Sequence, residues 1–208
     1  MSSFYMSGYF IRLIVPMGLM LATPSMAQSQ SSGAAGPSNK ASVALQWNGS
    51  GCAKLDEHLD VEGGSITFQK DFGHSFKVKK GNGLRLGDSR KNCSLIVTAN
   101  GTPQQIAVKI VELEGAQSFP SSMKLDLSID VASQGQSQSK SYALKTESGP
   151  TFKISQVLDA KDQAWSVCRR GLNINIKQRL DGTAKAPDNG GEADLKSIKF
   201  VLETKSCK

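Results

Sequence analysis

The clearest pattern along the chain is an alternation of apolar and polar residues between positions 172 and 180. The apolar positions are Leu172, Ile174, Ile176 and Leu180, and the residues between them include Asn173, Asn175 and Lys177. A period of two places the apolar side chains on one face, as in a half-buried antiparallel strand. Trp165 and Cys168 precede this strand. The cysteine can link the start of the strand to another part of the fold, and the tryptophan is large enough to cover that bond.

Similar short apolar runs recur along the chain, separated by Gly, Asn, Asp or Pro. The candidate strands lie at residues 42–47, 65–68, 76–78, 93–99, 106–110, 125–131, 140–145, 151–157, 172–180 and 198–202. Eight to ten short strands without a convincing helical period favour an all-β fold, an antiparallel β-sandwich or an open barrel. Residues 55–61 offer one helical turn at most, and two long polar loops are expected at 132–139 and 183–192.

The first 27 residues have the pattern of a secretory signal peptide. Arg12 precedes an apolar run of ten residues (13–22), and the small residues Ser25 and Ala27 fit cleavage near Ala27. A membrane anchor is disfavoured, because a helical span needs about 20 apolar residues. We therefore expect a secreted protein, extracellular or periplasmic, with no transmembrane segment in the mature chain. A flexible Ser/Gly-rich leader at 28–41 would precede a single β-sandwich domain at 42–208.

The composition adds a bias towards anionic partners. The chain has 38% hydrophobic residues, enough for a core, and a formal net charge of +7. An exported basic domain is predisposed to bind polysaccharides, lipid headgroups or nucleic acid.

Four cysteines in an exported chain predict two disulfides. We favour Cys52–Cys93 with Cys168–Cys207, because each bond links neighbouring parts of the chain across about 40 residues. The nested arrangement, Cys52–Cys207 with Cys93–Cys168, is the alternative. A metal site is a weak interpretation, because no two cysteines have the short spacing of zinc ligands and the two histidines are not placed to complete a site.

The order of several short motifs resembles a known family. The motifs are Gly51-Cys52, DSRKNCSLI at 88–96, WSVC at 165–168, LNIN at 172–175, Arg179-Leu180 and the terminal Cys207. Together they resemble the uncharacterised family of small secreted four-cysteine proteins of fungi and bacteria defined as domain of unknown function DUF4360. The resemblance covers residues 43–207, although Val167 stands where many relatives have proline. It implies export and a β-rich, disulfide-bonded domain, and it brings no catalytic residues.

Two histidines and one acidic loop are candidates for chemistry. His58 lies in an acidic stretch, and His74 is close to Asp71 and Ser75. Neither local cluster shows a base with its partner, and there is no GxSxG motif, so a solvated loop is the better interpretation. The stretch from Asp188 to Asp194 offers oxygen ligands for calcium but lacks the EF-hand pattern, so we expect a polar turn. We predict no enzymatic activity, no metal and no cofactor.

The most suggestive feature is a basic segment. It carries six cations against the single acid Asp88; the cations are Lys77, Lys79, Lys80, Arg85, Arg90 and Lys91. We expect a basic hairpin that turns at residues 81–83 and could bind phosphate or sulfate groups. Phe72 and Phe76 are too few aromatic residues for a base-stacking platform, so no specific nucleic-acid binding is expected. The plainer interpretation is a charged hairpin that protects a sheet edge.

These observations predict a secreted, non-enzymatic binding module or cell-envelope-associated protein that contacts anionic glycans or envelope polymers through the basic segment. The alternative is a structural matrix or surface protein without a specific ligand, and an extracellular hydrolase ranks last because no catalytic constellation stands out. A binding module predicts a compact basic patch, whereas a structural protein predicts dispersed charge.

Overall fold

The computed structural model describes residues 42–52, 57–62, 64–100, 103–136, 139–147, 149–182 and 190–207. The predicted signal peptide (1–27) and leader (28–41) lie outside the described residues. Residues 183–189, which belong to the expected loop at 183–192, also lie outside the described residues.

Eleven strands and one short 3-10 helix make up the secondary structure of the described residues, and every strand pair is antiparallel. The elements are β1 (Ser42–Asn48), β2 (Glu57–Glu62), β3 (Ser65–Asp71), β4 (Lys77–Lys80), η1 (Leu86–Ser89), β5 (Arg90–Asn100), β6 (Gln104–Ser118), β7 (Met123–Ser133), β8 (Lys140–Leu144), β9 (Thr151–Val157), β10 (Leu172–Gly182) and β11 (Gly191–Ser206). Within this part of the chain no helix has the length and apolar character needed to cross a bilayer.

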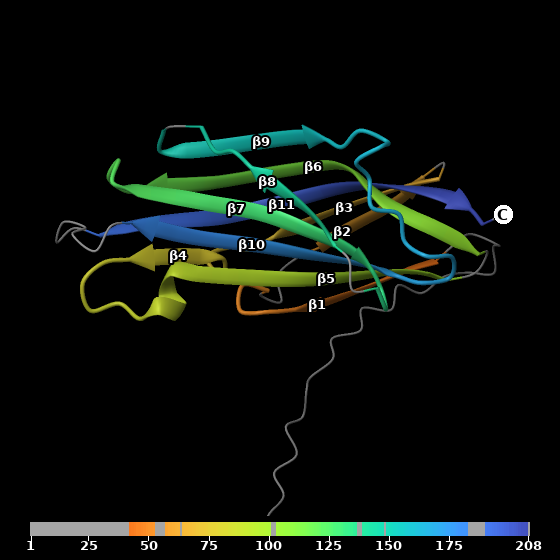
Figure 1. Cartoon of the computed structure of the whole chain (residues 1–208), viewed down its shortest axis with the longest axis horizontal. Coiled ribbons are helices and arrows are strands. Elements are labelled where there is room, and N and C mark those ends of the chain that lie inside the picture. Colours follow the sequence, from red (N-terminus) through yellow and green to blue (C-terminus); the bar gives the residue numbers. More distant parts are fainter. Residues whose placement is uncertain are drawn as a thin grey trace, which may run out of the picture.

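The strands form two sheets that pack face to face (Figure 1). The first sheet has the order β1-β5-β10-β7-β8, and the second has the order β2-β3-β11-β6-β9. Strand β4 also pairs with β11, beyond the end of β3. The predicted β-sandwich is confirmed.

Strand β10 lies at the centre of the first sheet because its sequence suits that position. Every second side chain from Leu172 to Leu180 is buried, while the residues between them are partly or fully exposed. Strand β7 alternates in the same way, and the two strands pair along their full length. Gln178 is the one polar residue among these inward positions; it is buried and lies opposite the half-buried Lys91 of β5.

The core contains apolar side chains from both sheets, with aromatic residues at its centre. Phe68 of β3 packs against Phe200 of β11 with ring centroids 5.0 Å apart, and its other neighbour is Trp47 at 5.7 Å. Phe72 and Phe76 form a second pair at 4.8 Å. The two phenylalanines of the basic region are therefore core residues, as fully buried rings of this size usually are.

Both favoured disulfides are present. Cys52–Cys93 joins the segment after β1 to the neighbouring strand β5. Cys168–Cys207 joins the segment before β10 to the end of β11, and so links the two sheets. The nested pairing is excluded.

Two local predictions are wrong. Residues 57–62 form an edge strand rather than a helical turn, because their backbone pairs antiparallel with β3. The segment 77–91 is not a hairpin: β4 pairs with β11 of the second sheet, whereas β5 belongs to the first sheet. The chain therefore crosses from one sheet to the other between Lys80 and Arg90.

Candidate anion-binding site

The first two predicted cations lie on the outer face of β4 and have an acidic partner. Lys77 and Lys79 face Asp194 and Glu192 of β11 across the strand pair. The Lys77 Nζ donates a hydrogen bond to Glu192 Oε1 at 2.8 Å, and the Lys79 Nζ lies 3.9 Å from Glu192 Oε2. The hydrogen bond from Lys77, together with the charges of both lysines, lowers the pKa of Glu192 below its ordinary value. One carboxylate thus offsets part of the charge of two lysines.

Lys80 lies beyond these residues, at the end of β4. Its Nζ donates to the backbone carbonyl of Gly182, at the end of β10, over 3.4 Å. Lys80 therefore connects the ends of the two sheets at the point where the chain crosses between them. This contact leaves the ammonium group without an acidic partner among the described residues.

The next two cations flank η1. Arg85 precedes the helix and Arg90 follows it, and both are exposed. The turn is held by its own polar groups: Asp88 Oδ2 accepts a hydrogen bond from the backbone N–H of Arg85 at 2.9 Å, and Ser89 Oγ donates to the carbonyl of Leu86. In the described part of the chain neither arginine side chain has an ion-pair partner.

Lys91, the sixth predicted cation, lies apart from the other five. Lys91 is half-buried and lies directly opposite the buried Gln178 in the β5–β10 ladder, so it faces inward. Arg90 is on the outer face of the same strand, opposite Arg179. Strand alternation thus divides the last two predicted cations between the two faces of the first sheet.

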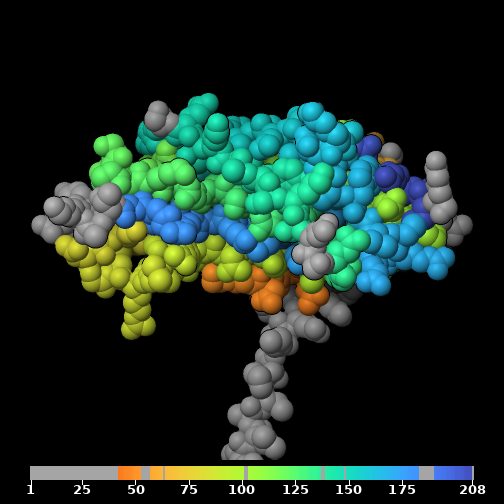
Figure 2. All heavy atoms as spheres, in the orientation of Figure 1, coloured from red at the N-terminus to blue at the C-terminus, as the bar shows by residue number. Residues whose placement is uncertain are grey.

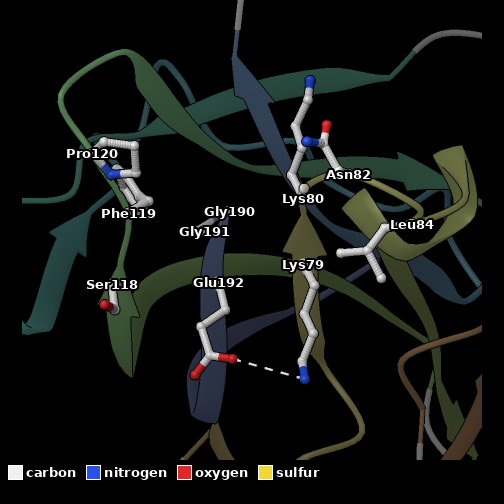
Figure 3. Close-up of a pocket in the computed structure, with 11 residues that line it drawn as sticks. Lys79, Lys80, Asn82, Leu84, Ser118, Phe119, Pro120, Gly190, Gly191 and Glu192 are labelled. Atoms are coloured by element: carbon white, nitrogen blue, oxygen red, sulfur yellow. Dashed lines mark ion pairs between the residues drawn. The ribbon is translucent and has the colours of Figure 1, made fainter. Parts of the chain in front are cut away.

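The structure does bring Lys79 and Lys80 together at a cavity of about 650 Å³ at this end of the sandwich (Figure 3). The lining residues are Lys79, Lys80, Gly81, Asn82, Leu84, Ser118, Phe119, Pro120, Gly190, Gly191 and Glu192. Figure 3 shows Phe119 and Pro120 on one side and Leu84 and Asn82 on the other, with the two glycines between them. The lining residues include two lysines, a carboxylate, an amide, a hydroxyl and an aromatic ring. The two lysine side chains point in opposite directions, that of Lys79 towards Glu192 and that of Lys80 away from it (Figure 3).

Glycine at 190 and 191 is what allows these segments to approach. Gly190 has a positive φ of 52°, and a Cβ there would lie 2.6 Å from the carbonyl oxygen of Lys80. A Cβ on Gly191 would lie 2.6 Å from the Cβ of Phe119. Both distances are shorter than real Cβ contacts, so a larger residue would push β4 or the β6–β7 connection away.

Several residues of the site were missed by sequence reasoning. Ser118 is the last residue of β6, Phe119 and Pro120 follow it, and Gly191 begins β11. In the sequence, Glu192 is a candidate only as a calcium ligand. All are remote in sequence from the basic segment. Their strands were recognisable by alternation, but alternation does not say which strand ends meet.

His74 has a partner that its sequence neighbours did not suggest. Its Nδ1 lies 2.7 Å from Oδ2 of Asp194, whose side chain is only 8% exposed. Ser75 Oγ donates instead to the carbonyls of Gly51 and Phe72, so it is not directed at the imidazole. The His–Asp pair lies at the surface without a hydroxyl or thiol nucleophile bonded to it among the described residues. A pair of this kind stabilises a buried carboxylate.

The candidate calcium loop is only partly described, since residues 183–189 lie outside the described residues. Its two described acids are engaged elsewhere, Glu192 with Lys77 and Asp194 with His74. Within the described ranges no group of three or more His, Cys, Asp or Glu side chains could hold a metal ion.

A second basic cluster lies at the opposite end of the sandwich, near the Cys168–Cys207 bond. Arg169 and Arg170 are exposed there, and Lys205 Nζ lies 3.8 Å from the centre of the Trp165 ring. One face of this indole is therefore already covered by a cation. Trp165 is less suited to stack on a ligand than Phe119 in the cavity.

Comparison with protein families identifies a match over most of the chain. The family model described as "Domain of unknown function (DUF4360)" matches residues 41–207, and so includes every strand described above. A comparison with curated proteins finds no match to the chain.

Proposed function

Because the chain belongs to the DUF4360 family, whose description assigns no activity, we propose a function from its surface: a secreted, non-enzymatic module of the cell envelope that binds an anionic polysaccharide in the basic cavity. The observation that carries this proposal is the meeting of Lys79 and Lys80 with Phe119 around one cavity.

The lining chemistry fits an acidic sugar. A carboxylate or sulfate group can bind the ammonium group of Lys79 or that of Lys80. The hydroxyl of Ser118 and the carboxylate of Glu192 can bond to sugar hydroxyls, and the Phe119 ring offers an apolar surface to the sugar ring. A volume of about 650 Å³ lies within the range of small-ligand sites.

Export is supported by two independent features. The first 27 residues have the n-region, apolar region and small-residue site of a secretory signal. Both disulfides use all four cysteines, as expected of a protein that folds in an oxidising compartment. An anionic envelope polymer would be accessible there.

The test is retention of the oxidised mature chain on an immobilised sulfated polysaccharide across a salt gradient. Lys79→Gln/Lys80→Gln is compared with Lys153→Gln/Lys199→Gln, which removes the same charge from ion pairs on the outer face of the second sheet. We expect the cavity variant to elute at clearly lower salt and the control variant to elute close to the wild type.

Phe119→Ala distinguishes binding in the cavity from general charge attraction. It leaves the net charge unchanged, so lower retention would show that the ring contacts the sugar. If the two double-lysine variants lower the elution salt equally and Phe119→Ala has no effect, retention depends on net charge alone and the proposal fails.

A further inference from the structure

The connection between the two sheets exposes two leucines, one on either side of Arg85. The side chain of Leu84 is 45% exposed and that of Leu86 is 69% exposed. Among the described residues five large hydrophobic side chains are exposed, and Leu86 has the largest exposed fraction of the five. Exposed leucines this close together suggest a contact surface rather than chance.

The tip that carries them stands free of the rest of the molecule. A Cβ added at Gly83 or at Gly87 would meet nothing within 4 Å. In Figure 2 the yellow-green segment that contains η1 projects from one end of the body. We call residues 83–90 the tip; the cavity wall is shared with it only through Leu84.

The charges around the tip are positive. Arg85 and Arg90 flank η1 without ion-pair partners among the described residues, and the one acid of the tip, Asp88, is bonded to the backbone of Arg85. Arg179 of β10 lies opposite Arg90 and is paired with Asp181, so among the described residues here the unpaired positive charge is that of Arg85 and Arg90. Apolar side chains surrounded by arginines match the chemistry of an anionic lipid surface, whose interior is apolar and whose headgroups are negative.

We propose that the tip docks the protein on an anionic lipid bilayer, with Leu84 and Leu86 inserted among the acyl chains and Arg85 and Arg90 bound to headgroup phosphates. Arginine suits this role because its planar group binds phosphate in a bidentate manner. Membrane docking is distinct from polysaccharide binding in the cavity, and each can occur without the other.

The other exposed apolar residues do not offer the same combination. Leu59 and Val61 lie on β2, where they alternate with Asp60 and Glu62, so an anionic surface would repel this edge. Val157 is 65% exposed at the end of β9, without a flanking arginine in its strand. Val157 is therefore a suitable control position.

The experiment is co-sedimentation of the oxidised mature chain with vesicles of phosphatidylcholine alone or with about one third phosphatidylglycerol. The wild type should bind the anionic vesicles and not the neutral ones. Leu84→Ser/Leu86→Ser should lower the partition coefficient at least about tenfold, because each leucine gains from leaving water. Arg85→Gln/Arg90→Gln should lower it too, whereas Val157→Ser should not.

A second readout follows insertion directly. Tryptophan placed by Leu86→Trp should shift its emission to shorter wavelength on addition of anionic vesicles. The single variant Leu86→Ser, at a position outside the cavity lining, should leave polysaccharide retention unchanged. Equal binding of the leucine pair and the wild type to anionic vesicles would overturn the proposal. Absence of vesicle binding by the wild type would overturn it as well. Loss of retention in cavity variants that still bind vesicles would support both proposals as separate properties. Vesicle binding by a wild type that the polysaccharide does not retain would support membrane docking alone.

Discussion

Arg90 of β5 lies directly opposite Arg179 of β10 in the antiparallel pairing of the two strands. Arg179 Nε is 2.7 Å from Asp181 Oδ1, but Arg90 has no acidic partner in the described part of the chain. Like charges placed opposite each other on a sheet lower stability. An anionic partner bound at this position would relieve the repulsion, so the pair links local instability to binding.

Replacing Arg90 by glutamate should therefore stabilise the fold while weakening binding to anionic vesicles. We expect a gain of about 0.5 kcal/mol in the free energy of unfolding at low salt, measured by urea denaturation. Arg90→Gln serves as the control and should fall between the wild type and Arg90→Glu, because it removes repulsion without adding attraction. The gain should shrink at high salt. A glutamate variant less stable than the wild type would contradict this explanation.

Removing His74 should destabilise the protein although its side chain is 80% exposed. Asp194 is buried, and its other oxygen, Oδ1, has no hydrogen-bond partner. His74→Ala would leave this carboxylate without its imidazole partner, at a cost of about 1–3 kcal/mol. Thermal or urea unfolding at neutral pH measures the loss.

The other histidine provides the matched control. His58 is exposed on the edge strand β2, so His58→Ala should change stability by less than about 0.5 kcal/mol. Similar losses in the two variants would show that the His74–Asp194 contact adds nothing of its own.

Gln178 should be a site where an apolar substitution stabilises the fold. The side chain is 1% exposed, and neither atom of its amide has a hydrogen-bond partner. Methionine has a similar shape and no such requirement, so Gln178→Met should raise the free energy of unfolding by about 1 kcal/mol or more. Gln69→Met, at an exposed position of β3, is the control and should have little effect. A destabilised Gln178→Met would show that the amide is solvated by buried water.

The first sheet could be predicted from the sequence to a useful degree. Alternation at residues 172–180 identified β10, because a strand with one buried face must repeat every two residues. The cysteine pairing followed from chain separation alone, since each bond closes a loop of about 40 residues.

The site could not be predicted in the same way. Lys77 and its partner Glu192 are 115 positions apart in the sequence, and His74 and its partner are 120 positions apart. Period-two patterns tell which face a residue occupies but not which strand lies beside it, so β4 and β5 were assigned to one hairpin although they belong to different sheets. The structure divides the six basic residues: Lys79 and Lys80 line the cavity, whereas Lys91 faces inward on β5.

Glu192 should restrain the affinity of the cavity for anions, because it pairs with Lys77 and lies near Lys79. Glu192→Gln should therefore raise the salt needed to elute the protein from a sulfated polysaccharide. Glu112→Gln removes the same charge from the ion pair between Glu112 and Lys199, and it should raise the elution salt less.

The Glu192 carboxylate should also make stability depend on pH. Since the hydrogen bond from Lys77 lowers the pKa of Glu192 from 4.5, the stabilising effect of this bond is present above that pH and is lost as the pH falls through the folded-state pKa. The variant should lack this acid-dependent loss in unfolding experiments, and equal retention of the two variants would mean that Glu192 does not act on the cavity.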